Sequence, residues 1–268
     1  MTDHPQEAVL ITMDEGIMTI SLNRPDRHNA INAALHVELA AAFERAAADP
    51  DVRAVLLRGE GRSFCSGGDV DGFAEWSEES LTGGRQMVGL EKQGRELLEA
   101  LLSVKQPVVA AVRGYALGLG ATLALFCDVV VAAEDAQFAD AHVNVGLVAG
   151  DGGAVAWPLM MPFGKAKYYL LTGERITGTD AEHLGLVLKA VPIDDLEQEA
   201  TRLARRLAAL APMAAAGTKA TLNLILRERM NLVLAYGLFY EGATFLSDDH
   251  VEATKAFAEK RTPQWTGT

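Results

Sequence analysis

Three short runs of almost purely apolar residues constrain the fold of this chain more than any other feature. They read VRAVLLRG (52–59), PVVAAVRG (107–114) and VVVAA (129–133). None of them alternates polar with apolar side chains, and such runs are typical of strands that are covered on both faces in a parallel sheet. Helical patterns at 86–102 and 119–127 lie between them. The alternation of strands and helices therefore predicts an α/β fold with a mainly parallel sheet and right-handed crossovers.

The N-terminal part adds a hairpin and a helix to this core. Residues 8–12 (AVLIT) and 17–22 (IMTISL) flank the turn signal DEG, which predicts a β-hairpin. From Ile31 onward, apolar residues recur every four positions through Phe43, which predicts an amphipathic helix.

The pattern changes after about residue 195. Three amphipathic segments follow at 196–210, 212–226 and 231–246, with a last short helix at 252–260 and no strand signal. We therefore expect a β/α core over residues 1–195 and a helical oligomerisation region over residues 196–268.

The composition excludes several classes of function. A chain of 268 residues that is 49% hydrophobic can bury a large core. The net charge of −12 argues against a nucleic-acid partner, which needs a basic surface. No apolar run reaches the roughly 18 residues of a membrane helix. Two cysteines form no disulfide framework or metal cluster, and the N-terminus lacks the layout of a signal peptide, so we expect a soluble cytoplasmic protein.

Two glycine-rich turns follow two of the buried strands. RSFCSGGDV (62–70) comes after the first strand, and RGYALGLGATL (113–123) links the second strand to an apolar helix. The carboxyl ends of parallel strands meet at one edge of a sheet, where α/β folds bind ligands. Two backbone N–H groups aimed at one oxygen from these turns would form an oxyanion hole, worth about 3–4 kcal/mol per donor. The alternative is that both are ordinary connections between a strand and a helix.

These turns, with three other segments, resemble the crotonase (enoyl-CoA hydratase/isomerase) superfamily. FCSGGDV and GYALGLGATLALFCD look like its paired signature, and the other three segments are LNRPDRHNAIN (22–32), LLTGERITGTDAEHLGLV (170–187) and AFAEKRTPQW (256–265). The resemblance implies a spiral β/α core with a C-terminal trimerisation region, assembled as a homotrimer or a dimer of trimers. It also implies an acyl-CoA substrate, with no cofactor other than the coenzyme A that the substrate carries.

The resemblance also assigns residues to the site. It implies that the amides of Gly68 and Leu119 form the oxyanion hole, although Leu119 stands where many relatives have glycine. The residues that it places around the substrate or coenzyme A are Arg24, Arg27, His28, Ala30, Ser66, Gly68, Asp69, Val70, Gly118, Leu119, Thr122 and Lys260. Structural roles are the alternative to contacts with coenzyme A. In that case, the arginines and the lysine are solvated surface charges, and Asp69 stabilises its own turn.

The two catalytic glutamates that hydratases of this family usually carry are absent. Thr122 stands at the first position and His142 at the second. Thr122 cannot act as a base at neutral pH, which puts ordinary hydration of an enoyl thioester in doubt. An imidazole is a natural general base near neutrality, because its unperturbed pKa is about 6.5.

His142 is followed nine residues later by Asp151, in FADAHVNVGLVAGDGG. This segment resembles the β-diketone hydrolases typified by 6-oxocamphor hydrolase, which use a His and an Asp at this spacing for retro-Claisen cleavage. We therefore expect His142 to transfer a proton and Asp151 to orient it, as in catalytic triads. The structural alternatives are a core histidine and a helix-capping aspartate.

The sequence thus predicts an enoyl-CoA hydratase/isomerase-type enzyme, a lyase or isomerase that stabilises an oxyanion or enolate of an acyl-CoA thioester. One alternative is a β-diketone C–C bond hydrolase that uses the His–Asp pair. The other is a crotonase-like acyl-CoA binder without turnover.

Overall fold

The computed structural model describes residues 7–69 and 84–268, with the side chains of residues 84–93 left out of the description. Its main sheet has six strands in the order β1-β2-β3-β4-β6-β9. Their bounds are β1 (Val9–Asp14), β2 (Ile17–Leu22), β3 (Ala54–Gly59), β4 (Val108–Val112), β6 (Val129–Ala133) and β9 (Lys189–Val191). Only the β1–β2 hairpin is antiparallel, and every other pair in this sheet is parallel. The predicted α/β class with a mainly parallel sheet is confirmed.

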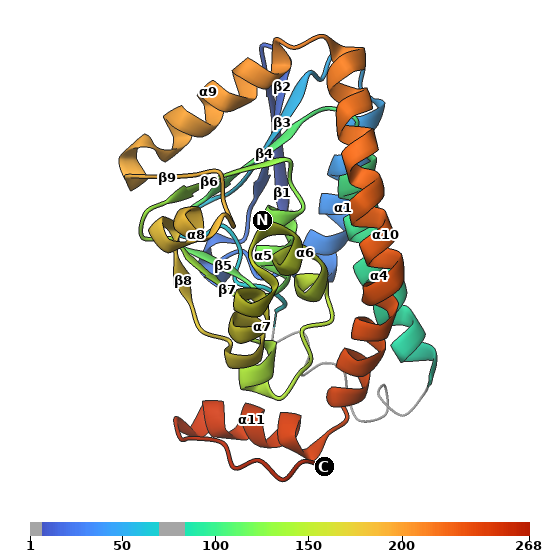
Figure 1. Cartoon of the computed structure of the whole chain (residues 1–268), viewed down its shortest axis with the longest axis vertical. Helices are drawn as coiled ribbons and strands as arrows, with labels where there is room; N and C mark the ends of the chain where they lie inside the picture. The colour runs from blue at the N-terminus through green and yellow to red at the C-terminus, as the bar shows by residue number, and fades with distance from the viewer. Residues whose placement is uncertain (1–6, 70–83) are drawn as a thin grey trace, which may run out of the picture.

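The continuous apolar runs are explained by layers on both faces of this sheet. All five residues of β4 are buried. Helices α1 (Ala33–Ala48) and α4 (Gly84–Ser103) lie on one side of the sheet and α9 (Leu196–Ala208) on the other, as Figure 1 shows. Helix α1 begins after Asn32, whose side chain accepts a hydrogen bond from the Leu35 N–H and so caps the helix.

A second, smaller sheet lies beside the first and was not predicted. It has three strands, in the order β5-β7-β8, at β5 (Tyr115–Leu117), β7 (Gln137–Ala139) and β8 (Ile176–Thr177). Strand β5 begins only three residues after β4 ends, so the chain passes from one sheet into the other within the second glycine-rich segment. Strands of two or three residues carry too little periodicity to be recognised in a sequence.

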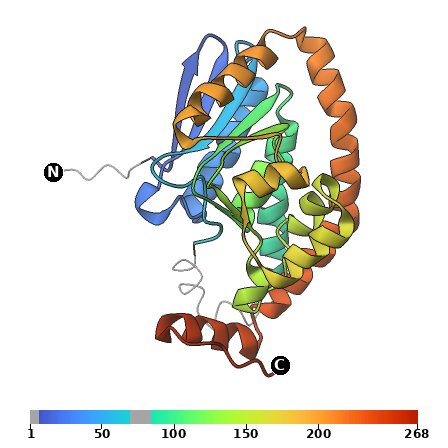
Figure 2. The same cartoon turned by 60° about the vertical axis from the view of Figure 1, so that its left-hand side comes forward.

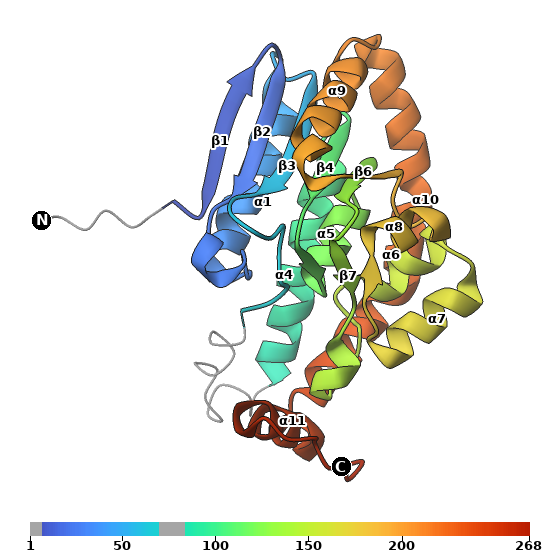
Figure 3. The same ribbon diagram turned by 90° about the vertical axis from the view of Figure 1, so that its left-hand side faces the viewer.

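The remaining helices lie around the two sheets. They are η1 (Pro25–Arg27), α5 (Leu119–Leu125), η2 (His142–Val145), α6 (Gly153–Met160), α7 (Phe163–Thr172), α8 (Gly178–Leu184), η3 (Ile193–Asp195), α10 (Pro212–Thr244) and α11 (Asp248–Glu259). Among the described residues, α10 packs on α4 and α6 rather than on a strand. Figures 2 and 3 show α10 running the length of the molecule beside α4, with α11 turned across one end.

The C-terminal helices differ from the prediction in two respects. The two amphipathic segments predicted at 212–226 and 231–246 form the single 33-residue helix α10. Helix α9 packs on β3, β4 and β6, so it is a layer of the core even though it follows the predicted boundary at residue 195. The boundary itself stays a prediction, and a helical region that stands apart from the sheet begins with α10.

No single described helix is long and apolar enough to cross a membrane. By length and composition alone, one pair passes that test together, Ile193–Ala208 with Pro212–Thr244, and it is bent by 108°.

The link between the two sheets depends on a glycine. Gly114 has φ +54°, and a Cβ at this position would lie 2.1 Å from the Arg62 carbonyl oxygen. We predict that Gly114→Ala lowers the free energy of unfolding by more than about 2 kcal/mol, because an L-residue is strained there and the backbone must move.

The matched control is Gly164→Ala in the first turn of α7, where nothing lies within 4 Å of an added Cβ. It should leave the free energy of unfolding unchanged or raise it slightly. Urea denaturation followed by circular dichroism measures both variants. Equal stability of the two would contradict this account.

Candidate active site

The two glycine-rich turns lie directly against each other. The Cys65 N–H donates to the Tyr115 carbonyl at 2.8 Å, and the Leu117 N–H donates to the Cys65 carbonyl at 3.0 Å, so the turns pair as two parallel strands do. Gly67 has φ +93°, and a Cβ there would lie 2.8 Å from the Leu117 carbonyl oxygen. Glycine is therefore needed for the two backbones to approach.

This pairing brings the predicted oxyanion donors to one region. Leu119 is the first residue of α5, so its N–H has no acceptor inside the helix. The N–H groups on either side of Gly68 are both engaged, that of Gly67 with the Cys65 sulfur and that of Asp69 with the Ile31 carbonyl. Within the described part of the chain, the N–H groups of Gly68 and Leu119 have no hydrogen-bond acceptor. Two free donors from adjoining turns can bind one negatively charged oxygen.

The N-terminal segment after β2 is tied to the first turn. Arg24 forms an ion pair with Asp69 (Nη1 to Oδ2, 2.7 Å) and also donates to the Ala30 carbonyl. Asn29 donates from Nδ2 to the carbonyl oxygens of Ser63 and Glu60, at 2.7 and 3.0 Å. Arg24 and Asp69 thus link the segment after β2 to the first turn, and the predicted contact of Arg24 with a phosphate stays a prediction.

The other residues predicted to bind coenzyme A are placed as follows. The His28 carbonyl accepts from the Ser66 N–H at 3.0 Å, and the His28 ring lies beside the Ser63 hydroxyl at 2.9 Å. Arg27 is exposed at the end of η1. Lys260 is exposed at the C-terminal cap of α11, at the end of the molecule. Val70 lies outside the described residues.

His142 lies against the second turn. Helix η2 begins at His142, three residues after β7 ends. A Cβ on Gly118 would lie 3.1 Å from Cε1 of His142, so the imidazole packs on the residue immediately before Leu119. Gly118 also has φ +50°, which favours glycine. The structure thus brings together the predicted proton-transfer residue and one of the predicted oxyanion donors.

Both nitrogens of His142 face carboxylates. Nδ1 lies 2.5 Å from Oδ1 of Asp140, and Nε2 lies 3.4 Å from Oδ2 of Asp151 and 3.8 Å from Oε1 of Glu241. The predicted pair of His142 and Asp151 is close in space, but the residue that hydrogen-bonds and orients the ring is Asp140. The prediction that Asp151 orients the ring is corrected accordingly, and Asp151 faces the other ring nitrogen.

Asp140 and Glu241 were missed by reasoning from the sequence. Asp140 carried a weak signal, because it is an acid in an apolar run two residues before His142. Glu241 comes from α10, ninety residues after Asp151, and nothing near it in the sequence relates it to the site.

Thr122 does not line the site in this conformation. It is fully buried on α5, and its γ-methyl group lies against Gly152. Its hydroxyl has no hydrogen-bond partner of ordinary geometry among the described residues, although its proximity to Asp151 lowers the pKa of that carboxyl group. The prediction that Thr122 contacts the substrate is therefore wrong for this structure, because a side chain without exposed surface supports Asp151 instead.

Known proteins share this architecture over nearly the whole chain. Residues 12–268 match the family model described as enoyl-CoA hydratase/isomerase. A probable enoyl-CoA hydratase of Rhodobacter capsulatus is 38% identical over 256 residues, which is 95% of this chain and 96% of that protein. The 2,3-dehydroadipyl-CoA hydratase of Escherichia coli is 34% identical over 265 residues, 97% of this chain and 98% of that protein. The crystal structure of an enoyl-CoA hydratase/isomerase from Mycobacterium paratuberculosis superposes with a TM-score of 0.85 at 37% identity, covering 93% and 98% of the two chains.

The chain belongs to the enoyl-CoA hydratase/isomerase family. The predicted superfamily and the predicted lyase or isomerase class are thereby confirmed. The acids around His142 affect its protonation state.

The surroundings of His142 favour its charged form. Burial alone would lower the pKa of the imidazole, but the carboxylates of Asp151, Asp140 and Glu241 outweigh it and hold this pKa well above the usual value. The imidazolium form of His142 is therefore favoured more than in a free histidine, and the neutral form that can act as a base grows only as the pH rises through the raised pKa. His142 therefore becomes available as a base at a higher pH than the ordinary pKa of histidine predicts.

The pKa values of Asp151 and Glu241 are raised as well, which for a carboxyl group favours the neutral form. Burial raises the pKa of Asp151 to about 6, opposed by the positive charge of His142. Burial and the neighbouring Asp151 raise the pKa of Glu241 to about 8. At neutral pH, Asp151 is mostly ionised whereas Glu241 is mostly a neutral carboxylic acid.

The same groups meet the distance requirement for a metal ion, because donor atoms of Asp140, His142 and Asp151 lie within 4.8 Å of one another. However, the 2.5 Å contact between Nδ1 and Asp140 is a hydrogen bond that occupies both atoms. We therefore interpret the group formed by Asp140, His142, Asp151 and Glu241, called here the acid–histidine cluster, as a set of groups that share protons.

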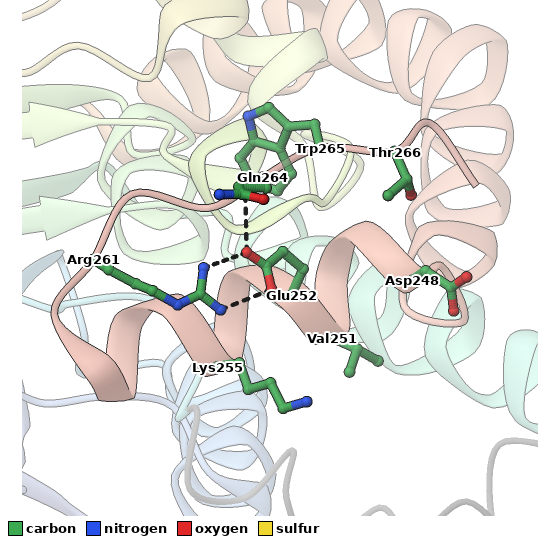
Figure 4. Close-up of a pocket in the computed structure, with 8 residues that line it drawn as sticks. All are labelled: Asp248, Val251, Glu252, Lys255, Arg261, Gln264, Trp265 and Thr266. Atoms are coloured by element: carbon green, nitrogen blue, oxygen red, sulfur yellow. Dashed lines mark hydrogen bonds and ion pairs between the residues drawn. The ribbon is translucent and has the colours of Figure 1, made fainter.

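A separate surface cavity of about 570 Å³ lies between α11 and the C-terminal segment (Figure 4). Glu252 lines it and accepts hydrogen bonds from Arg261 Nη2 and from the Gln264 N–H, each at 2.8 Å. None of the residues of the acid–histidine cluster or the two turns lines this cavity.

The orienting role of Asp140 can be tested through the pKa of His142. Asp140→Asn removes a carboxylate that raises this pKa and leaves the burial that lowers it. We predict that the pKa of His142 falls by about one unit or more, measured by an NMR titration of the imidazole carbon-bound protons. Asp135→Asn, at an exposed position just before β7, is the control and should not move it. An unchanged pKa in Asp140→Asn would rule out the 2.5 Å partnership.

Proposed function

We propose that this protein catalyses proton transfer at the carbon next to the carbonyl of an acyl-CoA thioester. The N–H groups of Gly68 and Leu119 bind the thioester oxygen as it becomes an enolate oxyanion, and His142 exchanges the proton. The observation that carries this proposal is the contact of the His142 ring with Gly118, the residue that precedes Leu119.

The hydrogen bonds of the His142 ring indicate which of its two nitrogens exchanges the proton. Asp140 accepts from Nδ1–H, which leaves Nε2 as the nitrogen that gains and loses the proton. Nε2 faces Asp151, whose ionised form stabilises the imidazolium that results when the ring takes the substrate proton. Positioned acid–base groups of this kind contribute about 10²–10⁴-fold to a rate.

The substrate class is proposed from the family and from the named relatives, which include a 2,3-dehydroadipyl-CoA hydratase. In this proposal, coenzyme A enters with the substrate and no further cofactor takes part. The segment 22–32 and the first glycine-rich turn hold the coenzyme, with Lys260 contributing a charge. The protein works in the cytoplasm.

We also propose that the chain assembles as a homotrimer or a dimer of trimers. Helix α10 supports this, because it exposes several large apolar side chains, including Leu224, Leu232, Tyr236 and Phe239. Exposed apolar patches of this kind mark protein–protein contacts.

A second candidate is hydrolysis of a carbon–carbon bond in a β-dicarbonyl compound. It is favoured by the proximity of His142 and Asp151 together with the threonine at the first glutamate position. There, the neutral His142 would activate water, and the two amides would hold the enolate that leaves. A binder without turnover would leave the acid–histidine cluster without a role.

One experiment separates these candidates. The protein is incubated with a panel of enoyl-CoA thioesters, saturated acyl-CoAs and cyclic β-diketones, and the products are read by mass spectrometry. We expect hydration or double-bond migration of a thioester. Cleavage of a diketone alone would transfer the assignment to the C–C hydrolase, and binding without any product would support the binder.

The oxyanion hole gives a prediction that depends on one N–H group. Leu119 occupies the first position of α5, which tolerates proline, so Leu119→Pro deletes the N–H with little damage to the helix. We predict a loss of at least about a hundredfold in turnover, the usual scale for one oxyanion donor. Leu119→Gly keeps the N–H and should retain most of the rate. Equal losses in two folded variants, as judged by circular dichroism, would exclude this amide.

A further inference from the structure

We propose that Glu241, from the C-terminal helix α10, is the second proton-transfer group of the active site and replaces the carboxyl group that is missing at Thr122. This inference rests on the proposed function, because it takes His142 as the first such group. A reaction that adds or moves a proton needs both a donor and an acceptor, and at the first glutamate position α5 supplies only a buried threonine.

Two glycines allow α10 to reach the site. A Cβ on Gly237 would lie 3.1 Å from the Gly150 Cα atom, and a Cβ on Gly150 would lie 2.4 Å from the Gly237 carbonyl oxygen. The helix backbone therefore packs directly on the loop that contains Asp151. Glu241 lies four residues after Gly237, on the same face of the helix. Its carboxyl group is therefore close to Asp151, the residue after Gly150.

The contacts of Glu241 leave its carboxyl group available. Oε1 lies 3.8 Å from Nε2 of His142, and Oε2 is buried without a hydrogen-bond partner among the described residues. The Glu241 and Asp151 side chains are each 11% exposed, and that of His142 is 14% exposed, so all three have similar access to a ligand. A buried carboxyl group with an unpaired oxygen is costly, and the ion-pair contact that Glu241 makes is with His142 inside the cluster, not with a charge elsewhere in the fold.

Burial and the neighbouring charges keep the Glu241 carboxyl group protonated. The groups that face it are Asp151, His142 and Asp140, together with the Gly150 N–H, and burial with these neighbours raises its pKa to about 8. On α4, which also packs against α10, the described Arg95 and Glu99 pair with Asn231 and Arg227, ten or more residues before Glu241. A neutral carboxylic acid thus stands beside a histidine at neutral pH.

Glu241 and His142 can complete a reaction without a further reactant. Nε2 of neutral His142 takes the proton from the α-carbon, and the electrons of the broken C–H bond form the enolate that the two amides hold. The O–H group of Glu241 gives its proton to the carbon at which the enolate is quenched, and the enolate electrons form the new C–H bond. The imidazolium then returns its proton to the Glu241 carboxylate, so protons and electrons balance.

The test compares Glu241→Gln with Glu228→Gln, an exposed glutamate on the same helix. On the best thioester of the panel, we expect Glu241→Gln to lose at least about a hundredfold in kcat while the Kd for that thioester changes by less than about threefold. Glu228→Gln should stay within about twofold of the wild type. As the pH rises, neutral His142 becomes more abundant while the Glu241 acid is lost near pH 8. In the wild type, kcat/KM should therefore stop rising at about pH 8, whereas in Glu241→Gln it should continue to rise with pH.

A readout independent of activity is the infrared band of a protonated carboxyl group. We expect it in the wild type at pH 7, with loss above pH 8 and in Glu241→Gln. Absence of the band in the wild type, or a Glu241→Gln variant that keeps over a tenth of the rate while His142→Ala is inactive, would overturn this inference alone. Full activity in both Glu241→Gln and His142→Ala would overturn the proposed function as well.

Discussion

The hydrogen bonds between Cys65 and strand β5 hold the two glycine-rich turns together, and the geometry of the site depends on them. Strands β3 and β4 are neighbours in the main sheet, so the segments that follow them leave the sheet at the same edge. Pairing of Cys65 with Tyr115 and Leu117 then keeps the two turns in contact beyond the sheet. The buried sulfur packs under the start of α5, and burial raises the pKa of Cys65 to about 12, so this thiol is a packing group rather than a nucleophile. The result is two free N–H groups in a rigid frame.

The acid–histidine cluster adds charge to that frame at a cost in stability. Four ionisable groups share a nearly buried volume, and their charges could not all be ionised there without strong repulsion among the carboxylates. Burial and the neighbouring acids raise the pKa values of Asp151 and Glu241, so both carboxyl groups hold a proton to a higher pH than in water, and the acids raise the pKa of His142 against the effect of its burial. For Glu241, the stability that the proton preserves is present at low pH and declines as the pH rises from the unfolded value of 4.5 toward about 8. Groups with such shifts are a mark of functional sites.

Much of the frame could be predicted from the sequence, because it is encoded locally. Buried parallel strands leave continuous apolar runs, as in β4, and backbone approaches leave glycines, as at Gly67 and Gly118. The pairing of His142 with Asp151 was also predicted, from the resemblance of this segment to the β-diketone hydrolases. The role of Asp140 was not, because a hydrogen bond to one ring nitrogen depends on a rotamer. The presence of Glu241 at the site could not be predicted. It depends on how α10 packs against Gly150, a contact between segments far apart in the chain.

The central claim is that His142 exchanges a proton with a carbon next to a carbonyl held by Gly68 and Leu119. The most direct measurement is the incorporation of deuterium at the α-carbon of butyryl-CoA in D₂O, followed by NMR. This probe needs no complete reaction and so does not depend on the natural substrate. The account predicts exchange by the wild-type protein, at least about a hundredfold slower exchange by His142→Ala, and nearly equal affinity of both for butyryl-CoA. Undiminished exchange by a folded His142→Ala variant would contradict it.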